Sequence, residues 1–205
     1  QYFKQRIKIP KTEEMKDPLP VTQKIPNWFK QLGVFIVRDV LSKLANKQYL
    51  IVNLSLSPVL ALFMGYFVKY YDVIGVENPV YTFYNNFNIP VYFFMSVVVA
   101  LFVGLIVSAE EIFRDRKILK REKFLHLSHS SYLLSKVIIL FGISAVQTLS
   151  FILVGNYILE IPFTEMRYWW IIFSCSCFAN MLGLNISAAF DSAVTIYILI
   201  PVLVI

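Results

Sequence analysis

The stretch SAEEIFRDRKILKREK, residues 108–123, is a dense block of charge between two long apolar segments. Seven Lys and Arg residues lie between positions 114 and 136, against four carboxylates between positions 110 and 122. An excess of Lys and Arg in a short loop beside membrane spans marks the cytoplasmic side of the membrane. The sequence therefore predicts that residues 110–135 form a cytoplasmic loop at which the chain leaves the membrane and returns.

The apolar residues inside this stretch recur at a spacing that predicts an amphipathic helix. They are Ile112, Phe113, Ile118 and Leu119. The apolar face of such a helix needs a partner. One interpretation places the helix on the lipid surface, with its Lys and Arg on anionic headgroups, and the other docks it on a protein. The residue types alone do not separate the two.

The composition excludes a soluble globular domain. The 205-residue chain is 58% hydrophobic and has a mean hydropathy of +0.64, whereas apolar residues make up at most about half of a soluble domain. A net charge of +6 is compatible with nucleic-acid binding, but the basic residues flank apolar segments, as expected of residues that set membrane topology. We expect an all-α polytopic membrane helical bundle that contacts the lipid bilayer and no nucleic acid.

The chain divides into three segments. Residues 1–26 hold Pro10, Pro18, Pro20 and Pro26 and are predicted to be a cytoplasmic linker. Residues 27–48 are predicted to form an amphipathic connecting helix at the membrane interface, and residues 49–205 a transmembrane domain. The apolar face expected for the connecting helix comprises Trp28, Leu32, Phe35, Ile36, Val40 and Leu44, with Lys30, Arg38, Lys43 and Lys47 elsewhere.

The transmembrane domain is predicted to have spans at about 50–69, 90–109, 136–159 and 168–189, and a truncated fifth span at 193–205. Ten Lys and Arg residues lie at or before Lys47 and seven in the central loop, which leaves Lys69 and Arg167 for the opposite side. The N-terminus is therefore predicted to be cytoplasmic, in a multi-pass protein of the cell (inner or plasma) membrane. Because the chain begins without Met and ends inside an apolar run, we expect it to be part of a longer protein.

Catalytic chemistry is not expected in this segment. Residues 51–68, 90–109, 137–159 and 168–189 lack Asp, Glu, His, Lys and Arg, whereas ion-coupled transporters and voltage sensors usually need an ionisable group inside the membrane. The seven glycines do not form the G-x-x-x-x-G-K-[ST] loop that binds ATP. His126 and His129 could share a helix face but have no Cys or suitably spaced carboxylate beside them, and Cys175 and Cys177 fall on different helix faces, so neither pair indicates a metal site. We predict no catalytic, cofactor or metal site here and an energy source elsewhere.

Small residues recur every four positions along two spans. They are Ser96, Ala100, Gly104 and Ser108 in the second span, and Ala179, Gly183 and Ser187 in the fourth. Such stripes let helix backbones approach closely, so we predict that they are helix-packing surfaces. The polar residues within the spans are Asn53, Gln147, Asn156, Asn180 and Asn185. These either hydrogen-bond between helices or line a substrate path, and the sequence leaves both interpretations open.

The string EEIFRDRKILKREKFLHLSHSSYLLSKV, residues 110–137, resembles the first intracellular loop of ABC-2 type exporter permeases, in particular the bacterial relatives of the White/ABCG group. The family pattern has an acidic residue and Ile at the end of the second span, a charged R-x-R-x-I-x-x-R-E stretch, and L-S-x-x-x-Y-L-L-S-K at the start of the third. This sequence carries the pattern at Glu111 and Ile112, over Arg114–Glu122 and over Leu127–Lys136. The predicted helix over residues 27–48 is also similar to the connecting helix that precedes the first span in the same group, with Gln31-Leu32 and Arg38-Asp39 at matching places.

The resemblance implies that the 110–135 loop is the coupling element that sits on an ABC ATPase domain. That domain, upstream on the same chain or on a separate subunit, would bind ATP and Mg²⁺. The residues implied in coupling are Glu111, Arg114, Arg116, Ile118, Leu119, Arg121, Glu122 and Leu127. The resemblance also implies an exporter that works as a homodimer, or as paired half-transporters, around a central translocation path.

Two other functions are compatible with the sequence. One is a non-transporting membrane anchor or sensor whose basic loop docks a cytoplasmic partner protein, and the other is a channel. An ATP-binding loop upstream in the full gene would favour transport, whereas a kinase or protein-interaction domain there would favour the anchor. A hydrophobic or amphipathic substrate is favoured for a transporter, because the spans carry no charge.

Overall fold

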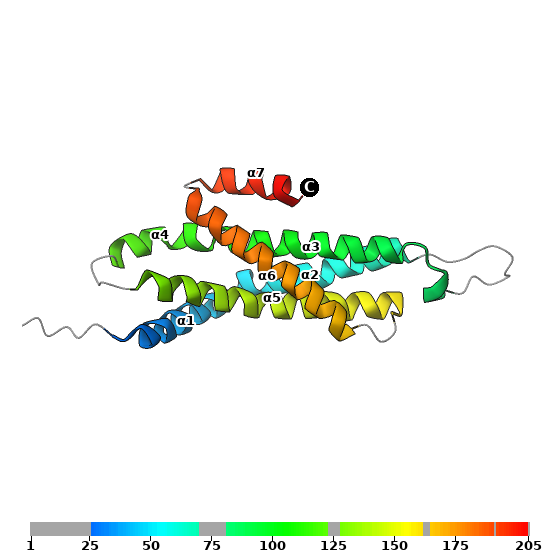
Figure 1. The fold of residues 1–205 in the computed structure, drawn as a ribbon, viewed down its shortest axis with the longest axis horizontal. Helices are drawn as coiled ribbons and strands as arrows, with labels where there is room; N and C mark the ends of the chain where they lie inside the picture. Colours follow the sequence, from blue (N-terminus) through cyan, green and yellow to red (C-terminus); the bar gives the residue numbers. More distant parts are fainter. Residues whose placement is uncertain (1–25, 70–80, 123–127, 162–164, 191, 205) are drawn as a thin grey trace, which may run out of the picture.

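The computed structural model describes residues 26–69, 81–122, 128–161, 165–190 and 192–204, and all its regular structure in these ranges is helical (Figure 1). The helices are α1 Trp28–Ala45, α2 Lys47–Val68, the short 3-10 helix η1 Phe83–Asn85, α3 Ile89–Ala109, α4 Glu111–Glu122, α5 His129–Leu159, α6 Glu165–Ala189 and α7 Ala193–Val204. Four helical segments, namely α2, α3 with its extension α4, α5 and α6, are long and apolar enough to cross a membrane. The prediction of an all-α polytopic membrane bundle is confirmed.

The charged stretch forms the helix α4 over Glu111–Glu122, in agreement with the predicted amphipathic helix. α4 continues the line of α3 (Figure 1), with Glu110 between them. α5 begins at His129, several residues before the predicted span, and Ser128 caps it by accepting a hydrogen bond from the N–H of Ser131 at 3.4 Å. The 31 residues of α5 extend for about 46 Å at about 1.5 Å per residue. This exceeds a hydrocarbon core of about 30 Å, so α5 is longer than an upright helix needs to cross the membrane.

The connecting helix ends earlier than predicted. α1 stops at Ala45, and the side chain of Asn46 accepts a hydrogen bond from the N–H of Tyr49 at 3.1 Å, which caps the start of α2. Asn is a preferred N-cap residue because its side-chain oxygen satisfies an otherwise unpaired N–H group of the first turn. The boundary therefore falls at Asn46 rather than at 48, and α2 starts with the polar residues Lys47 and Gln48.

The face that α1 buries agrees with the predicted apolar face in the first half of the helix and differs from it in the second half. Gln31 and Phe35 are buried, and the Phe35 ring meets the Tyr132 ring of α5 edge to face at 5.8 Å between centroids. Val40 and Leu44, which were expected on the same face, are 36% and 56% exposed. Asp39 and Lys43 occupy the inward side instead, because they form ion pairs with α4 and α5. The apolar pattern therefore predicted the buried side of the first half of α1, where Trp28, Leu32, Phe35 and Ile36 are buried or half-buried, and it failed for the second half.

α6 crosses α3 obliquely (Figure 1), and these two helices form the most extensive contact in the bundle. A side-chain carbon added at Gly104 would lie 2.9 Å from both the Ala179 Cβ and the Ser176 backbone oxygen. One added at Gly183 would overlap the hydroxyl of Ser108. The two small-residue stripes thus lie against each other, and we call this contact the α3–α6 seam.

α7 packs beside the α3–α6 seam rather than standing apart. Its Ile196 and Ile200 are buried in one apolar cluster with Leu105 and Ala109 of α3 and with Ala179 and Ile186 of α6. α2 lies at the edge of the bundle and is the least buried of the candidate spans. Many of its apolar side chains, such as Phe63 and Phe67, are more than half exposed, as expected of a helix that faces lipid.

Candidate functional site at the basic end of the bundle

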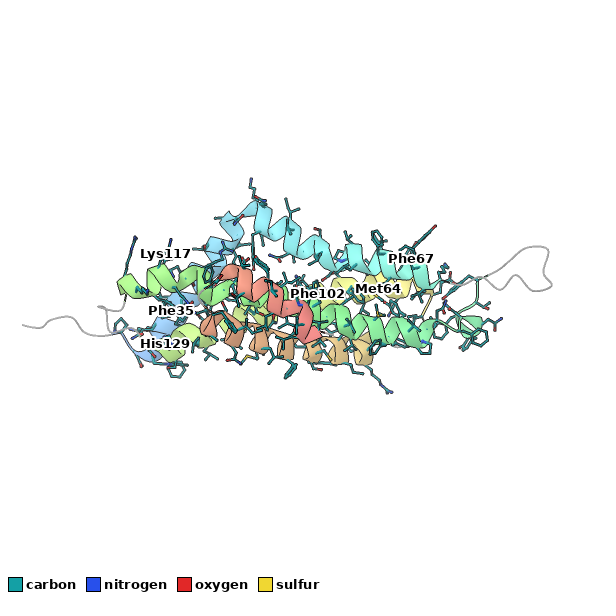
Figure 2. The ribbon with its side chains drawn as sticks, turned by 90° about the horizontal axis from the view of Figure 1, so that it is seen from above. Phe35, Met64, Phe67, Phe102, Lys117 and His129 are labelled. Carbon is teal, nitrogen blue, oxygen red and sulfur yellow. The ribbon has the colours of Figure 1, made fainter. Side chains whose placement is uncertain are left out.

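One end of the bundle gathers α1, α4 and the start of α5. Figure 2 shows Phe35, Lys117 and His129 at this end and Phe67 at the opposite end. The described Lys and Arg residues lie at the first end, apart from Lys69 and Arg167. We call it the basic end.

A buried lysine holds these helices together. The Lys136 side chain, on the second turn of α5, is 3% exposed. Its Nζ lies 2.8 Å from Asp39 Oδ1 on α1, 3.1 Å from Glu111 Oε2 on α4 and 2.8 Å from Asp115 Oδ2, also on α4. An ammonium group has three donors and these are three carboxylates, so each donor has an acceptor. Lys136 is therefore the centre of an ionic hub that joins α1, α4 and α5.

The remaining members of the hub bind the same three carboxylates. Lys43 Nζ forms a short ion pair with Glu111 Oε1 and lies 3.8 Å from Asp39 Oδ2. The Tyr132 hydroxyl donates a hydrogen bond to Asp115 Oδ2 at 3.0 Å, and the Tyr49 hydroxyl lies 3.5 Å from Glu111 Oε1. Two cations thus face three carboxylates, with two phenols that donate to the surplus negative charge. The hub as defined here comprises Asp39, Lys43, Tyr49, Glu111, Asp115, Tyr132 and Lys136.

This geometry suits mechanical linkage rather than catalysis. Each charged group in the hub is held by a partner of opposite charge on another helix, so none is positioned as a free nucleophile or base. Transferring a charge into a protein interior costs several kcal/mol, which is recovered only while its partners stay in place. The hub therefore fixes the relative positions of α1, α4 and α5 strongly and specifically.

A second set of contacts links α4 to the end of α6. The Ser187 hydroxyl oxygen accepts hydrogen bonds from the N–H groups of Ile112 at 3.0 Å and Phe113 at 2.9 Å. In return, Arg116 Nη2 donates to the backbone oxygens of Ser187 at 3.2 Å, Ala188 at 2.7 Å and Phe190 at 3.0 Å. Ser187 was predicted as a helix-packing residue, and it also caps the first turn of α4.

The residues implied in coupling to an ATPase domain occupy different environments. Glu111 is 6% exposed and lies within the hub, and Arg116 reaches α6. Arg114, Ile118 and Arg121 are exposed on α4, with Ile118 at 46%, and Leu119 is half-buried. Glu122 is the last residue of α4, and Leu127 lies outside the described residues. Surface contact with a partner is therefore open to the outer face of α4, whereas Glu111 and Arg116 face inward.

The predicted packing residues all belong to the two helices of the seam. Ser96 accepts a short hydrogen bond from the Tyr168 hydroxyl of α6 and is fully buried, and Ala100 is 6% exposed. Gly104 and Ser108 meet Ala179 and Gly183, as described above. Ser108 itself donates to the Gly104 backbone oxygen at 2.7 Å, which keeps its hydroxyl satisfied inside the bundle.

Two interpretations were open for the polar residues of the spans: hydrogen bonds between helices, or the lining of a substrate path. Gln147 donates to the Asn53 backbone oxygen at 2.8 Å, and Asn180 donates to the Ser144 hydroxyl at 2.7 Å, so both join helices. The Asn156 amide is buried and has no hydrogen-bond partner within the described residues. Asn185 is exposed on α6. Helix-to-helix hydrogen bonding thus accounts for Gln147 and Asn180 but not for Asn156 or Asn185.

The hub was missed at the level of sequence, although its members had been noticed. Asp39, Glu111 and Lys136 each belong to a motif quoted above, but they were interpreted as separate features of a connecting helix, a coupling loop and a span boundary. Lys136 directly precedes the uncharged run 137–159, which makes about six helical turns, so a lysine at this place is easily interpreted as the boundary of a span. A buried cation requires carboxylates nearby. This requirement is the signal that could have linked Lys136 to Glu111 and Asp115.

The sequence matches a known protein family over most of its length. A family model described as ABC-2 type transporter matches residues 30–205. The match includes most of α1 and all of the other helices, and therefore both the hub and the α3–α6 seam. No curated protein and no solved structure matches the chain. The long apolar helices and the match over most of the sequence lead to one conclusion: the chain belongs to the ABC-2 type transporter family, as a multi-pass transmembrane component.

Proposed function

We propose that this chain forms the translocation path of an ATP-driven exporter and receives the force for transport from an ABC ATPase domain at the basic end. The observation that carries the proposal is the outer face of α4. Ile118 is 46% exposed there, between the exposed residues Lys117 and Arg121. An apolar side chain ringed by charges, at the tip of a membrane bundle, suits a docked protein whose charges set the register.

The hub supports this proposal because it links α4 directly to α1 and α5. A push on α4 is transmitted through Glu111 and Asp115 to Lys136 on α5 and to Lys43 on α1. Rigid ion pairs allow α1, α4 and α5 to shift as a body, as in the helix movements that switch transporters between inward-facing and outward-facing states. The ATP and Mg²⁺ would be bound by the ATPase domain, and the working unit would be a dimer or a pair of half-transporters.

Docking is tested by placing a charge on the outer face of α4. In the full-length transporter with its ATPase domain, Ile118→Asp should leave membrane insertion intact. ATP-dependent efflux of a panel of amphipathic fluorescent dyes should fall at least about tenfold, because an unpaired charge is forced into the docked surface. The matched control is Tyr84→Asp, which puts the same charge on an 88% exposed apolar side chain beyond the opposite end of α3. Equal efflux in both variants, at normal expression, would leave a lipid-surface role for α4 as the better account.

The orientation of the chain is tested by cysteine labelling. We propose that the basic end, including the N-terminus, is cytoplasmic, because Lys and Arg concentrate there. In a background with Cys175 and Cys177 replaced by serine, a membrane-impermeant maleimide applied to intact cells should label Asn85→Cys and not Ser128→Cys. Labelling of the second position alone would mean that the topology is inverted, and that an ATPase domain would have to be sought at the other end.

A further inference from the structure

We propose that Arg116 and Ser187 form a reciprocal helix cap that makes the first turn of α4 and the last turn of α6 a single mechanical unit. In this account Arg116 is a positioning residue that acts inside the chain, and it makes no docking contact to the ATPase domain. The cap itself is independent of the proposed function, but its role in transmitting force rests on that function.

The first half of the cap satisfies the start of α4. The first N–H groups of a helix have no partner within the helix, and a serine oxygen is a preferred acceptor for them. Here the acceptor comes from a different helix: the Ser187 hydroxyl accepts from both Ile112 and Phe113. Ser187 is fully buried, so water cannot take its place without a gap opening between α4 and α6.

The second half satisfies the end of α6. The last carbonyl groups of a helix lack partners and carry partial negative charge, so a cation is favoured there. The Arg116 guanidinium donates to three such oxygens, those of Ser187, Ala188 and Phe190. Phe190 lies beyond the last residue of α6, where the chain leads to α7. Each helix thus caps the other with one of its own side chains, Ser187 from α6 and Arg116 from α4.

Apolar packing surrounds these hydrogen bonds. Phe113 of α4 packs against the cluster in which Ile186 of α6 is buried with Ile196 and Ile200 of α7. A displacement of α4 relative to α6 would therefore break the five hydrogen bonds and separate these apolar surfaces together. We infer that α6 and α7 follow α4, while the hub carries the same displacement to α1 and α5.

Amide hydrogen exchange on the full-length protein in lipid nanodiscs, without nucleotide, tests the cap itself. Ser187→Ala should speed exchange of the Ile112 and Phe113 amides about fivefold, as expected for the loss of about one net hydrogen bond. Arg116→Ala should do the same for the amides of the last turn of α6 and for the amide of Phe190 just beyond it, whose N–H bonds to the Ile186 oxygen at 3.1 Å. Because the cap is reciprocal, each variant should also speed exchange at the other helix end, by at least about twofold.

Matched controls separate the cap from local disturbance. Ser135→Ala removes an equally buried hydroxyl, which donates only to the Tyr132 oxygen of its own helix, and Lys117→Ala removes an exposed charge next to Arg116. Neither should change exchange at the two helix ends. Arg116→Lys should fall between wild type and Arg116→Ala, since it keeps a cation but loses the planar fork. Effects confined to the mutated helix, or absent, would overturn the proposal.

A second arm uses ATP with orthovanadate to test the transmission of force. In the wild type, trapping should alter exchange in the last turn of α6, and in Ser187→Ala and Arg116→Ala this response should shrink at least about threefold with the ATPase domain still bound. Loss of that domain in Arg116→Ala but not in Ser187→Ala would make Arg116 a docking residue and sink the inference. A wild type without any response to ATP would count against the proposed function, while the nucleotide-free experiment would still decide the cap.

Discussion

The hub at the basic end and the α3–α6 seam in the middle of the bundle both hold helices in close contact, but with opposite chemistry. In the hub, Lys136 is surrounded by three carboxylates at 2.8 to 3.1 Å. In the seam, Gly104 and Gly183 remove side chains so that Ala179 and Ser108 can approach the backbone. The hub relies on attraction between charges, and the seam relies on shape.

The difference has a physical origin in the surroundings. Lipid tails are as apolar as leucine, so helices inside the membrane gain little from burying apolar surface, and close packing becomes the main attraction. Near the membrane boundary, neighbouring helices can bring side chains of opposite charge together, so that these side chains leave water as a paired group. The two regions should therefore fail differently: the hub through loss of one partner, and the seam through gain of one methyl group.

The largest effect is expected from breaking the hub. Lys136→Met removes the central cation and leaves three carboxylates close together with Lys43 as the remaining cation of the hub, which should destabilise the bundle by about 3–5 kcal/mol. Thermal unfolding in detergent, followed by the loss of the monodisperse peak in size exclusion, measures this. Lys117→Met, the same change at an exposed site on α4, should cost less than about 0.5 kcal/mol. Similar stability of the two variants would contradict the closed hub.

A smaller effect is expected from overfilling the seam. Gly104→Ala places a methyl group 2.9 Å from the Ser176 backbone oxygen, which cannot rotate away, so α3 and α6 must separate at a cost of about 1–3 kcal/mol. Gly142→Ala is the matched control. It makes the same change in α5 with no atom within 4 Å of the new carbon, and it should stabilise the helix by up to about 1 kcal/mol. The same unfolding measurement compares them, and effects of equal sign would argue against a tight seam.

The smallest effect is expected for a polar contact that belongs to neither region. Gln147 of α5 donates to the Asn53 oxygen of α2 at 2.8 Å, while its own side-chain oxygen has no partner within the described residues. Interhelical hydrogen bonds in membranes contribute on the order of 0.6 kcal/mol, so Gln147→Met should lower the free energy of unfolding by less than about 1 kcal/mol. A loss above about 2 kcal/mol would mean that Gln147 also binds something else, such as a buried water.

The seam illustrates what could be inferred from sequence. Small residues spaced by four identify a surface of a helix without reference to the rest of the chain, because 3.6 residues make one turn. Ser108 and Gly183 were therefore assigned to packing surfaces, although the stripes alone did not reveal that they pack against each other. α1 shows the converse: Asp39 and Lys43 face inward, against their polarity, because their partners lie on α4 and α5.

Sequence patterns were enough to predict that the chain is helical, that it crosses the membrane several times, and where its basic residues concentrate. These properties depend on local composition and on a period that a single helix already contains. The docking of the helices, in contrast, brings Lys136, Glu111 and Asp39 into one buried site and lets Arg116 and Ser187 cap each other's helices. Those pairings join residues 25 to 97 positions apart, and an ion pair or a cap between helices depends on how the helices dock, which no local pattern contains.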